Sequence, residues 1–332
     1  MKIEAAILEK KKKIKIMEII DDGLPKDYLI VKMKYSGICG SQIAEYLGNR
    51  GKDNFLPHML GHEGTGIVYK TGGNVKHLKK GDKVFLTWIK PKSINYQNYT
   101  FKKGKKNINS GPVTTFSNFT YVSKYCAHKL PKYLNYKSGV LMGCAFPTGY
   151  GMVKNFSKVS NKKILICGLG GVGLSSLIGA IEHKPAEIHI IDKNKKRVDE
   201  VLSYIKSRNI SYLKKAKKKY YDYIFEATGD IHSLQNTLEY LNDSGKCIFA
   251  THPKSKLKIK INPHDLIKGK KIEGCWGGKI SYPKDINLIG KSIKKNEKLM
   301  RLFFNKSYKF KNIQHAFNEY FKGVSIRPLI KF

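Results

Sequence analysis

Cys39, His62 and Cys144 are residues whose types suit metal chemistry, and each stands in a short stretch that contains glycine: GICGS, LGHEG and MGCAF. Zinc prefers thiolate sulfur and imidazole nitrogen, and three protein ligands leave the fourth position open for water or substrate. The three residues together therefore predict a catalytic rather than a structural zinc. Taken one at a time, each could instead be a buried thiol or a hydrogen-bonded histidine.

A second chemical pattern occupies residues 164–192, ILICGLGGVGLSSLIGAIEHKPAEIHIID, which reads as a strand, a glycine-rich turn, a helix and a second strand. Gly168 would permit the tight turn, Gly170 would let the backbone approach a pyrophosphate, and Gly173 would let the helix pack closely on the strand. The anion would lie at the helix N-terminus. This stretch predicts a dinucleotide site, although the glycine motif alone also occurs in ordinary turns.

Asp192, at the end of the second strand, bears on the choice of dinucleotide. Its carboxylate would accept hydrogen bonds from both ribose hydroxyls and would repel a 2′-phosphate. The sequence therefore favours NAD over NADP. Four basic residues follow at once and could soften that preference: Lys193, Lys195, Lys196 and Arg197.

The composition limits the classes of protein to consider. A chain of 332 residues suggests two domains. The net charge of +38 would suit a polyanion partner, but only five of the 63 basic residues are arginine, and the lysines are scattered over every segment. Arginine is the usual reader of phosphates and bases, so a specific nucleic-acid site is disfavoured. Nonspecific adhesion to polyanions at low salt is still expected.

The cysteine spacing and the hydropathy point to a cytoplasmic protein. Six widely spaced cysteines with no CxxC pair are better read as ligands or core residues than as a disulfide framework. No run of about 18 apolar residues suggests a membrane span, and the first residues lack the apolar region of a signal peptide.

The order of the elements predicts an α/β fold with two domains. Residues 1–35 alternate short apolar runs with turn residues, as antiparallel strands do. From about 153 to 280, strand and helix patterns alternate, which predicts a doubly wound parallel sheet of the Rossmann type. FEATGD, at 225–230, ends one of these strands, so Thr228 either lines the cofactor or is a plain strand end.

Four motifs together resemble the medium-chain, zinc-dependent alcohol dehydrogenases. GHEGTG around His62, continuing to Gly72 and Val75, matches that family's zinc signature. GICGS, CAFPTGYG and GLGGVG follow in the family's order and approximate spacing, and the final SIRPLIKF resembles its closing strand. The resemblance covers the whole chain. It implies a mostly antiparallel, GroES-like catalytic domain at 1–150, completed by 281–332, and a Rossmann NAD(H)-binding domain at 151–280.

The resemblance also assigns roles to residues. Cys39, His62 and Cys144 would bind the zinc, with Glu63 beside it, and Ser41 would take the proton of the zinc-bound alcohol. Thr148 and Val172 would press on the nicotinamide, or would only pack. Arg197 would lie near the adenosine ribose, or at the surface, and Arg327 would meet the pyrophosphate. The predicted catalytic residues are Ser41, Glu63 and Thr148; the predicted cofactor residues are Gly168, Gly170, Gly171, Val172, Gly173, Asp192, Arg197, Thr228 and Arg327.

Two departures from the family pattern are visible. Residues 85–125 lack the four clustered cysteines that bind a structural zinc in many members, so one zinc per subunit is expected. Ala44 stands where some members have a proton-relay histidine, so the proton would leave by another route. The lysine-rich residues 85–115 could form part of the substrate mouth.

The predicted activity is hydride transfer between an alcohol, held as a zinc alkoxide, and NAD. The substrate would be a small alcohol or aldehyde, or a polyol, in a homodimer or homotetramer. A polyol, sugar or nucleotide-sugar dehydrogenase of the same family is an alternative. A polyanion-binding or nucleic-acid-binding protein that senses NAD(H) is an alternative of another class.

Overall fold

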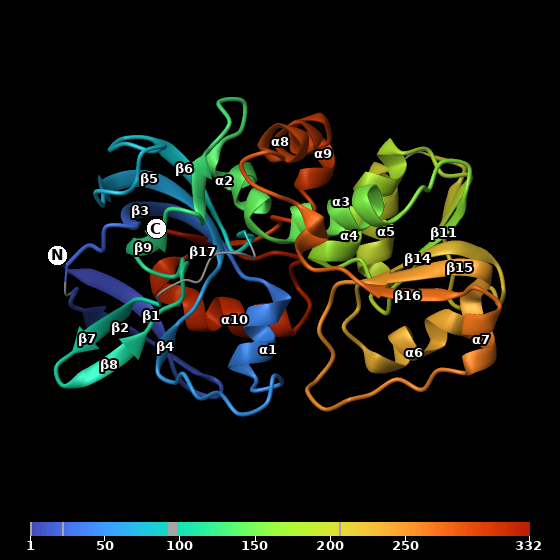
Figure 1. The fold of residues 1–332 in the computed structure, drawn as a ribbon, viewed down its shortest axis with the longest axis horizontal. Helices are drawn as coiled ribbons and strands as arrows, with labels where there is room; N and C mark the ends of the chain where they lie inside the picture. Colours follow the sequence, from blue (N-terminus) through green and yellow to red (C-terminus); the bar gives the residue numbers. More distant parts are fainter. Residues whose placement is uncertain (1, 22, 92–97, 206) are drawn as a thin grey trace. The chain divides into compact units, whose positions relative to one another are not determined.

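The chain divides into two compact units, unit 1 (Met1–Cys144 and Ser281–Phe332) and unit 2 (Ala145–Ile280). The structure is a computed structural model that describes residues 2–21, 23–91, 98–205 and 207–332. In Figure 1 the C-terminal residues, drawn in red, return to the strands of the N-terminal part. The expected domain boundary between residues 150 and 151 falls inside helix α3 (Ala145–Phe156), all of which belongs to unit 2.

Unit 1 contains two mainly antiparallel sheets. One has the strand order β2-β1-β4-β8-β7, and the other has the order β10-β6-β5-β3-β18-β17, with β9 also paired to β3. The closing strand of the chain pairs with β3, which completes the unit from the far end of the sequence. The strands are β1 (Ile3–Lys10), β2 (Lys13–Ile19), β3 (Tyr28–Gly37), β4 (His58–Met59), β5 (Glu63–Thr71), β6 (Lys83–Thr87), β7 (Thr100–Lys103), β8 (Lys106–Asn109), β9 (Phe119–Ser123), β10 (Ala127–Lys129), β17 (Ser307–Lys309) and β18 (Leu329–Lys331).

Short helices connect and cover these strands. The apolar face of α10 contributes Ile313, Ala316 and Phe317 to a buried cluster with Phe116 and Ile330, so the helix packs on the sheet through residues three to four apart. The helices of unit 1 are α1 (Gly40–Tyr46), α2 (Tyr136–Gly139), η1 (Val140–Gly143), α8 (Ile286–Lys295), α9 (Glu297–Met300), η3 (Phe310–Asn312) and α10 (Ile313–Phe321).

Unit 2 is built on a six-stranded sheet of order β13-β12-β11-β14-β15-β16, in which every neighbouring pair is parallel. This is the 3-2-1-4-5-6 order of the Rossmann fold, and it confirms the predicted doubly wound sheet. The order reverses between β11 and β14, where such sheets bind ligands beyond the strand ends. The strands are β11 (Lys163–Cys167), β12 (Glu187–Ile191), β13 (Ile210–Tyr212), β14 (Tyr221–Glu226), β15 (Leu241–Phe249) and β16 (Lys271–Gly274).

Helices accompany the strands of unit 2. Leu234 and Leu238 of α6 pack against Leu165 and Ile224 of the sheet, which buries one face of the helix. Trp276, after β16, is 62% exposed, and its ring stands edge-on to that of His252 with centroids 5.8 Å apart. The helices are α3 (Ala145–Phe156), α4 (Gly171–Glu182), α5 (Lys195–Tyr204), α6 (Ile231–Tyr240), α7 (Pro263–Ile267) and η2 (Gly277–Lys279).

Within the described ranges, none of the helices is both long and apolar enough to cross a lipid bilayer.

Candidate metal and cofactor sites

Three loops of unit 1 bring Cys39, His62 and Cys144 together. Cys39 is the N-cap of α1, two residues after the end of β3, and its backbone is extended (φ −96°, ψ 152°). His62 stands between β4 and β5, and Cys144 follows η1. The ligand atoms of all three lie within 4.8 Å of one another.

The spacing of these atoms fits a tetrahedral zinc. The Sγ atoms of Cys39 and Cys144 are 3.7 Å apart, and His62 Nε2 is 3.2 Å from Cys144 Sγ. With the usual zinc bond lengths, a tetrahedron has an S–S edge of about 3.8 Å and an N–S edge of about 3.6 Å. These two distances are close to the tetrahedral values, and three donors leave the fourth position open. The residues present therefore fit a catalytic zinc.

The electrostatics of the group favour a thiolate at Cys39. A hydrogen bond from the Cys144 thiol, together with the positive charges of Arg327 and His62, lowers the pKa of Cys39 well below its usual range. Thiolate is the form of cysteine that binds metal. The ring of Trp88 stands edge-on to the imidazole of His62, with centroids 6.5 Å apart.

Glu63 and Arg327 form a buried ion pair next to His62. Arg327 Nη1 donates to Glu63 Oε1 at 2.6 Å, and the two residues are 2% and 0% exposed. Burial raises the pKa of Glu63, although the charge of Arg327 opposes this. The structure thus places Arg327, predicted for the pyrophosphate, against the predicted neighbour of the metal.

Four buried polar atoms of α1 and of this ion pair have no hydrogen-bond partner among the described residues: Ser41 Oγ, Gln42 Nε2, Glu63 Oε2 and Arg327 Nε. A buried polar atom without a partner is costly, and native proteins usually satisfy it with solvent or a ligand. Ser41 lies two residues after Cys39, so one of these atoms stands close in sequence to the Cys-His-Cys group.

Two residues that hold the backbone before Cys144 could not be recognised from the sequence. Thr87 Oγ1 donates to the carbonyl of Gly143 at 2.8 Å, and Tyr282 Oη donates to the carbonyl of Met142 at 2.8 Å, so the two carbonyls before Cys144 are both held. Such groups orient a metal ligand through its backbone. Tyr282 is 140 residues from Met142, so local spacing could not have shown the contact.

The glycine-rich turn of unit 2 has the geometry that a dinucleotide site requires. Gly168 has φ +85°, which side chains rarely adopt. A Cβ on Gly173 would lie 1.7 Å from the carbonyl oxygen of Gly168, so the helix can approach the strand only because this residue has no side chain. A Cβ on Gly170 would meet nothing within 4 Å, and the backbone there is open to a ligand. The residues therefore fit a pyrophosphate.

Asp192 lies at the same turn. Its Oδ2 accepts a hydrogen bond from the backbone N–H of Leu169 at 2.6 Å, and its Oδ1 accepts one from Asn194 at 2.7 Å. Arg197 Nη1 is 3.9 Å from Asp192 Oδ2. The carboxylate is therefore fixed beside the turn, with a cation that partly offsets its charge.

Other predicted site residues of unit 2 lie on α3, on α4 and after β14. Gly171 and Val172 begin α4, and Thr148 is buried in α3. A Cβ on Gly149, the neighbour of Thr148, would lie 2.1 Å from the carbonyl oxygen of Val172, so α3 and α4 are in direct contact there. Thr228 follows β14, and its methyl carbon would be 3.0 Å from a Cβ on Gly168.

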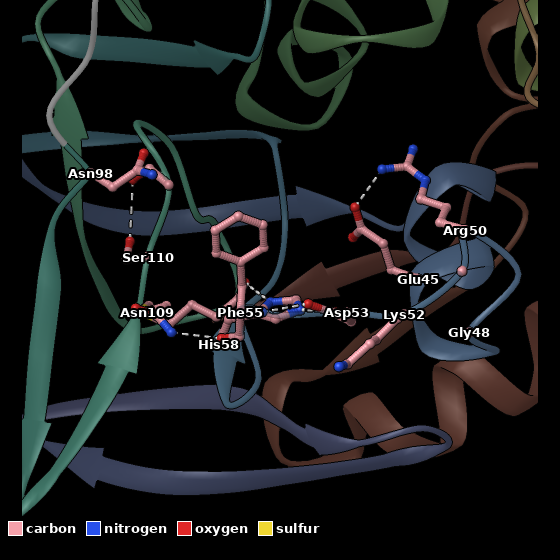
Figure 2. A pocket seen from close by; sticks show the side chains of 13 residues that line it. Glu45, Gly48, Arg50, Lys52, Asp53, Phe55, His58, Asn98, Asn109 and Ser110 are labelled. Carbon is pink, nitrogen blue, oxygen red and sulfur yellow. Dashed lines mark hydrogen bonds and ion pairs between the residues drawn. The ribbon is translucent and has the colours of Figure 1, made fainter. Parts of the chain in front are cut away.

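A separate cavity of about 500 Å³ lies in unit 1 (Figure 2). Its charged lining is largely paired within itself: Arg50 Nη1 lies 2.6 Å from Glu45 Oε1, and His58 Nε2 lies 2.9 Å from Asp53 Oδ2. Figure 2 shows the ring of Phe55 standing between these groups and the Asn98 and Ser110 side of the cavity. None of the three predicted zinc ligands lines it. We therefore do not place the reaction there.

Comparison with known proteins agrees with this picture. Residues 25–132 match the alcohol dehydrogenase GroES-like domain. The chain is 28% identical to alcohol dehydrogenase 6 of Peromyscus maniculatus, with 86% of each chain covered, and 24% identical to alcohol dehydrogenase class-3 of Drosophila melanogaster, with 99% of this chain and 97% of the relative covered. The solved structure of benzyl alcohol dehydrogenase from Acinetobacter calcoaceticus covers 100% of this chain and 99% of its own, with a TM-score of 0.86 and 22% identity.

A GroES-like unit with a Cys-His-Cys group and a Rossmann unit define an alcohol dehydrogenase-like oxidoreductase. The chain is thus similar to alcohol dehydrogenases over most of its length, and residues 25–132 form an alcohol dehydrogenase GroES-like domain. The predicted fold class, including the GroES-like domain, is thereby confirmed.

Proposed function

We propose that this chain is an alcohol dehydrogenase that transfers a hydride between a primary or secondary alcohol and NAD, with one catalytic zinc held by Cys39, His62 and Cys144. The observation that carries the proposal is that the three ligand atoms lie within 4.8 Å of one another, with two of their separations close to those around a tetrahedral zinc. Bound zinc lowers the pKa of a coordinated alcohol, and bound NAD accepts a hydride at C4 of its nicotinamide.

The residues around the ligands would handle the proton and the charge. Ser41 Oγ, buried and without a partner in the described structure, would act as a proton relay: it would accept the proton of the substrate hydroxyl and release its own hydroxyl proton in turn. Arg327 would offset the charge of Glu63 through their hydrogen bond, and the second carboxylate oxygen of Glu63, which has no partner among the described residues, would be free to bind a further group. Thr87 and Tyr282 would hold the Cys144 loop.

The residues of unit 2 would hold the cofactor. The backbone at Gly170 and the N-terminus of α4 would receive the pyrophosphate, and Asp192 would accept from the adenosine ribose hydroxyls. Because a carboxylate repels a 2′-phosphate, we propose that NAD is preferred over NADP.

The test is an absorbance screen at 340 nm with the zinc-loaded full chain. Primary and secondary alcohols, polyols, sugars and nucleotide-linked sugars would be offered with NAD and NADP in parallel, and the corresponding aldehydes with NADH and NADPH. Turnover of simple alcohols is expected. Absence of turnover with every substrate, from protein that holds one zinc per chain, would overturn the proposal.

Polyols, sugars and nucleotide-linked sugars are the second substrate class. The hairpin of β7 and β8 carries the exposed lysines Lys102, Lys103, Lys105 and Lys106, which would suit hydroxyl-rich or anionic substrates. Turnover of these compounds alone would select this alternative.

We also propose a homodimer or homotetramer in the cytoplasm, without a specific nucleic-acid partner. All six cysteines are free, as in a reducing compartment. Light scattering would report the oligomeric state. The other class of function, a polyanion-binding protein, requires DNA or RNA binding that persists at physiological salt, and a titration against salt would detect it.

A further inference from the structure

Glu226 is a buried carboxylate at the edge of the sheet where the strand order reverses. It is the last residue of β14, 1% exposed, and stands in register with Cys167 of β11 and Phe249 of β15. The carboxyl ends of these three strands meet beside the glycine-rich turn. Placing a carboxylate in this apolar layer is costly unless its oxygens are bound.

The two oxygens of Glu226 bind two different loops. Oε1 accepts hydrogen bonds from the backbone N–H of Thr228, at 3.0 Å, and from its hydroxyl. Oε2 accepts one from the hydroxyl of Thr251, in the loop after β15, at 3.3 Å. The Thr228 hydroxyl in turn accepts from the backbone N–H of Asp230 at 3.0 Å. One side chain thus joins the segment after β14 to the segment after β15.

The first of these loops forms a wall of the glycine-rich turn. A Cβ on Gly168 would be 3.0 Å from Thr228 Cγ2, and a Cβ on Gly173 would be 3.4 Å from Ala227 Cβ. The backbone N–H of Ala227 donates to the carbonyl of Cys167, the residue before the turn, at 2.9 Å. A displacement of Thr228 would therefore move a surface that touches the turn at Gly168.

We propose that Glu226 is a positioning residue for the dinucleotide: it fixes the loop of Thr228 and the loop of Thr251 at the spacing that the bound cofactor requires. It acts through these two loops and does not itself touch the cofactor. This inference rests on the proposed cofactor site in unit 2 and is independent of the metal group.

The experiment measures the dissociation constants of NADH and NADPH by fluorescence for the full chain and its variants. The melting temperature of each variant is recorded alongside, and KM for NAD and kcat are measured separately. Glu226→Ala leaves the Thr228 N–H without an acceptor and should weaken NADH binding about tenfold or more. Glu226→Gln keeps an oxygen for Thr228, and its amide can donate to Thr251, so binding should stay within about threefold of wild type. KM for NAD should rise in the alanine variant while kcat changes little.

A matched control lies at the other end of the same strand. Asp222 accepts hydrogen bonds from the backbone N–H of Lys163 at 2.8 Å and from Asn242 Nδ2 at 3.0 Å, so it also joins two segments. Asp222→Ala should lower the melting temperature and leave NADH binding within about twofold of wild type. If Glu226→Ala does not fold, Thr251→Val removes one of the bonds alone and should still weaken NADH binding.

Three outcomes would overturn the proposal. NADH binding unchanged in a folded Glu226→Ala variant, or equally weakened in Glu226→Gln and Glu226→Ala, would show that the hydrogen bonds to the loops do not matter. Equal weakening in Asp222→Ala would show a general effect of stability. A wild-type chain that binds neither NADH nor NADPH would overturn the proposed cofactor site, and this inference with it.

Discussion

Arg327 donates to Glu63 at 2.6 Å across 264 residues of sequence, and both side chains are buried. The bond joins the residue that follows His62 to the segment just before β18. The end of the chain thus neutralises the carboxylate beside the metal group. Removing either partner would leave an unpaired charge in the interior.

Replacing Arg327 by Met should therefore destabilise unit 1 by about 3–5 kcal/mol, because the Glu63 charge stays buried without a partner. The double variant Glu63→Gln, Arg327→Met removes both charges and should recover part of that loss. Calorimetry of the wild type and both variants checks this. A single variant as stable as the wild type would contradict the importance of the pair.

Zinc content should depend on Cys39 and not on other buried cysteines. Cys39→Ala removes one of three ligands, so the purified chain should hold less than about 0.1 zinc, against about one in the wild type. Cys126→Ala is the matched control, since Cys126 is a buried thiol of the same unit outside the ligand group. Metal analysis decides the point. Equal zinc in the two variants would exclude Cys39 as a ligand.

Two alanine substitutions should separate cofactor binding from folding. Gly170 has φ −68°, and its Cβ would meet nothing within 4 Å, so Gly170→Ala should melt like the wild type but bind NADH at least about tenfold more weakly. In Gly173→Ala the new Cβ would collide with the Gly168 carbonyl. This substitution should therefore lower the free energy of unfolding by about 1–3 kcal/mol or more. Melting curves and NADH titrations distinguish the two effects. Normal NADH binding by Gly170→Ala would mean that the pyrophosphate lies elsewhere.

Asp192→Asn should shift the cofactor preference. The amide oxygen can still accept from the Leu169 N–H, while the charge that repels a 2′-phosphate is lost. The ratio of kcat/KM for NADP to that for NAD should rise about tenfold or more. Asp199→Asn, on the exposed side of α5, removes a charge nearby and should leave the ratio unchanged. A preference that does not move in Asp192→Asn would refute the role of this carboxylate.

Unit 1 should lose stability in mild acid because of His128. This residue of β10 is 7% exposed and packs against the rings of Phe85 and Tyr282, and burial, with the positive charge of His77, lowers its pKa to about 4. Between about pH 6.5 and about pH 4, His128 is protonated in the unfolded chain but stays neutral in the folded chain. The stability that the neutral ring contributes is therefore fully present above about pH 6.5. The free energy of unfolding falls by about 3 kcal/mol as the pH is lowered from about 6.5 to about 4.

The measurement is the melting temperature of the full chain from pH 7 to pH 4. His128→Phe should flatten the curve in this range, whereas His232→Gln, an exposed histidine of unit 2, should not. An unchanged slope in His128→Phe would assign the acid sensitivity to other groups.

The contiguous patterns could be predicted from the sequence. The strand, glycine-rich turn and helix around Gly170 depend on neighbouring residues, so local spacing specifies them, and the alternation from 153 to 280 predicted the parallel sheet that the structure contains. The three ligands were predicted as a set by residue type and family resemblance. The structure brings their donor atoms together within 4.8 Å.

The contacts between distant segments could not be predicted. Tyr282 binds the Met142 carbonyl, and Arg327 binds Glu63, because the C-terminal segment is part of unit 1. No periodicity in the sequence indicates that such distant residues are in contact. Glu226 was likewise missed. From the sequence, an acidic residue at a strand end is expected to be exposed, and only the packing of the sheet and its helices shows that Glu226 is buried. The expected boundary at residue 150 divides α3, whose hydrogen bonds run unbroken through that point.

The two tryptophans give each unit its own optical reporter. Trp88 stands beside His62, a predicted zinc ligand, so its emission should respond when metal enters or leaves unit 1. Trp276 is largely exposed in unit 2, beside His252, and should follow solvent and partner contacts there. Replacing either ring by Phe would leave one tryptophan in the whole chain. The native sequence thus allows unit 1 and unit 2 to be followed separately in one cuvette, without any added dye.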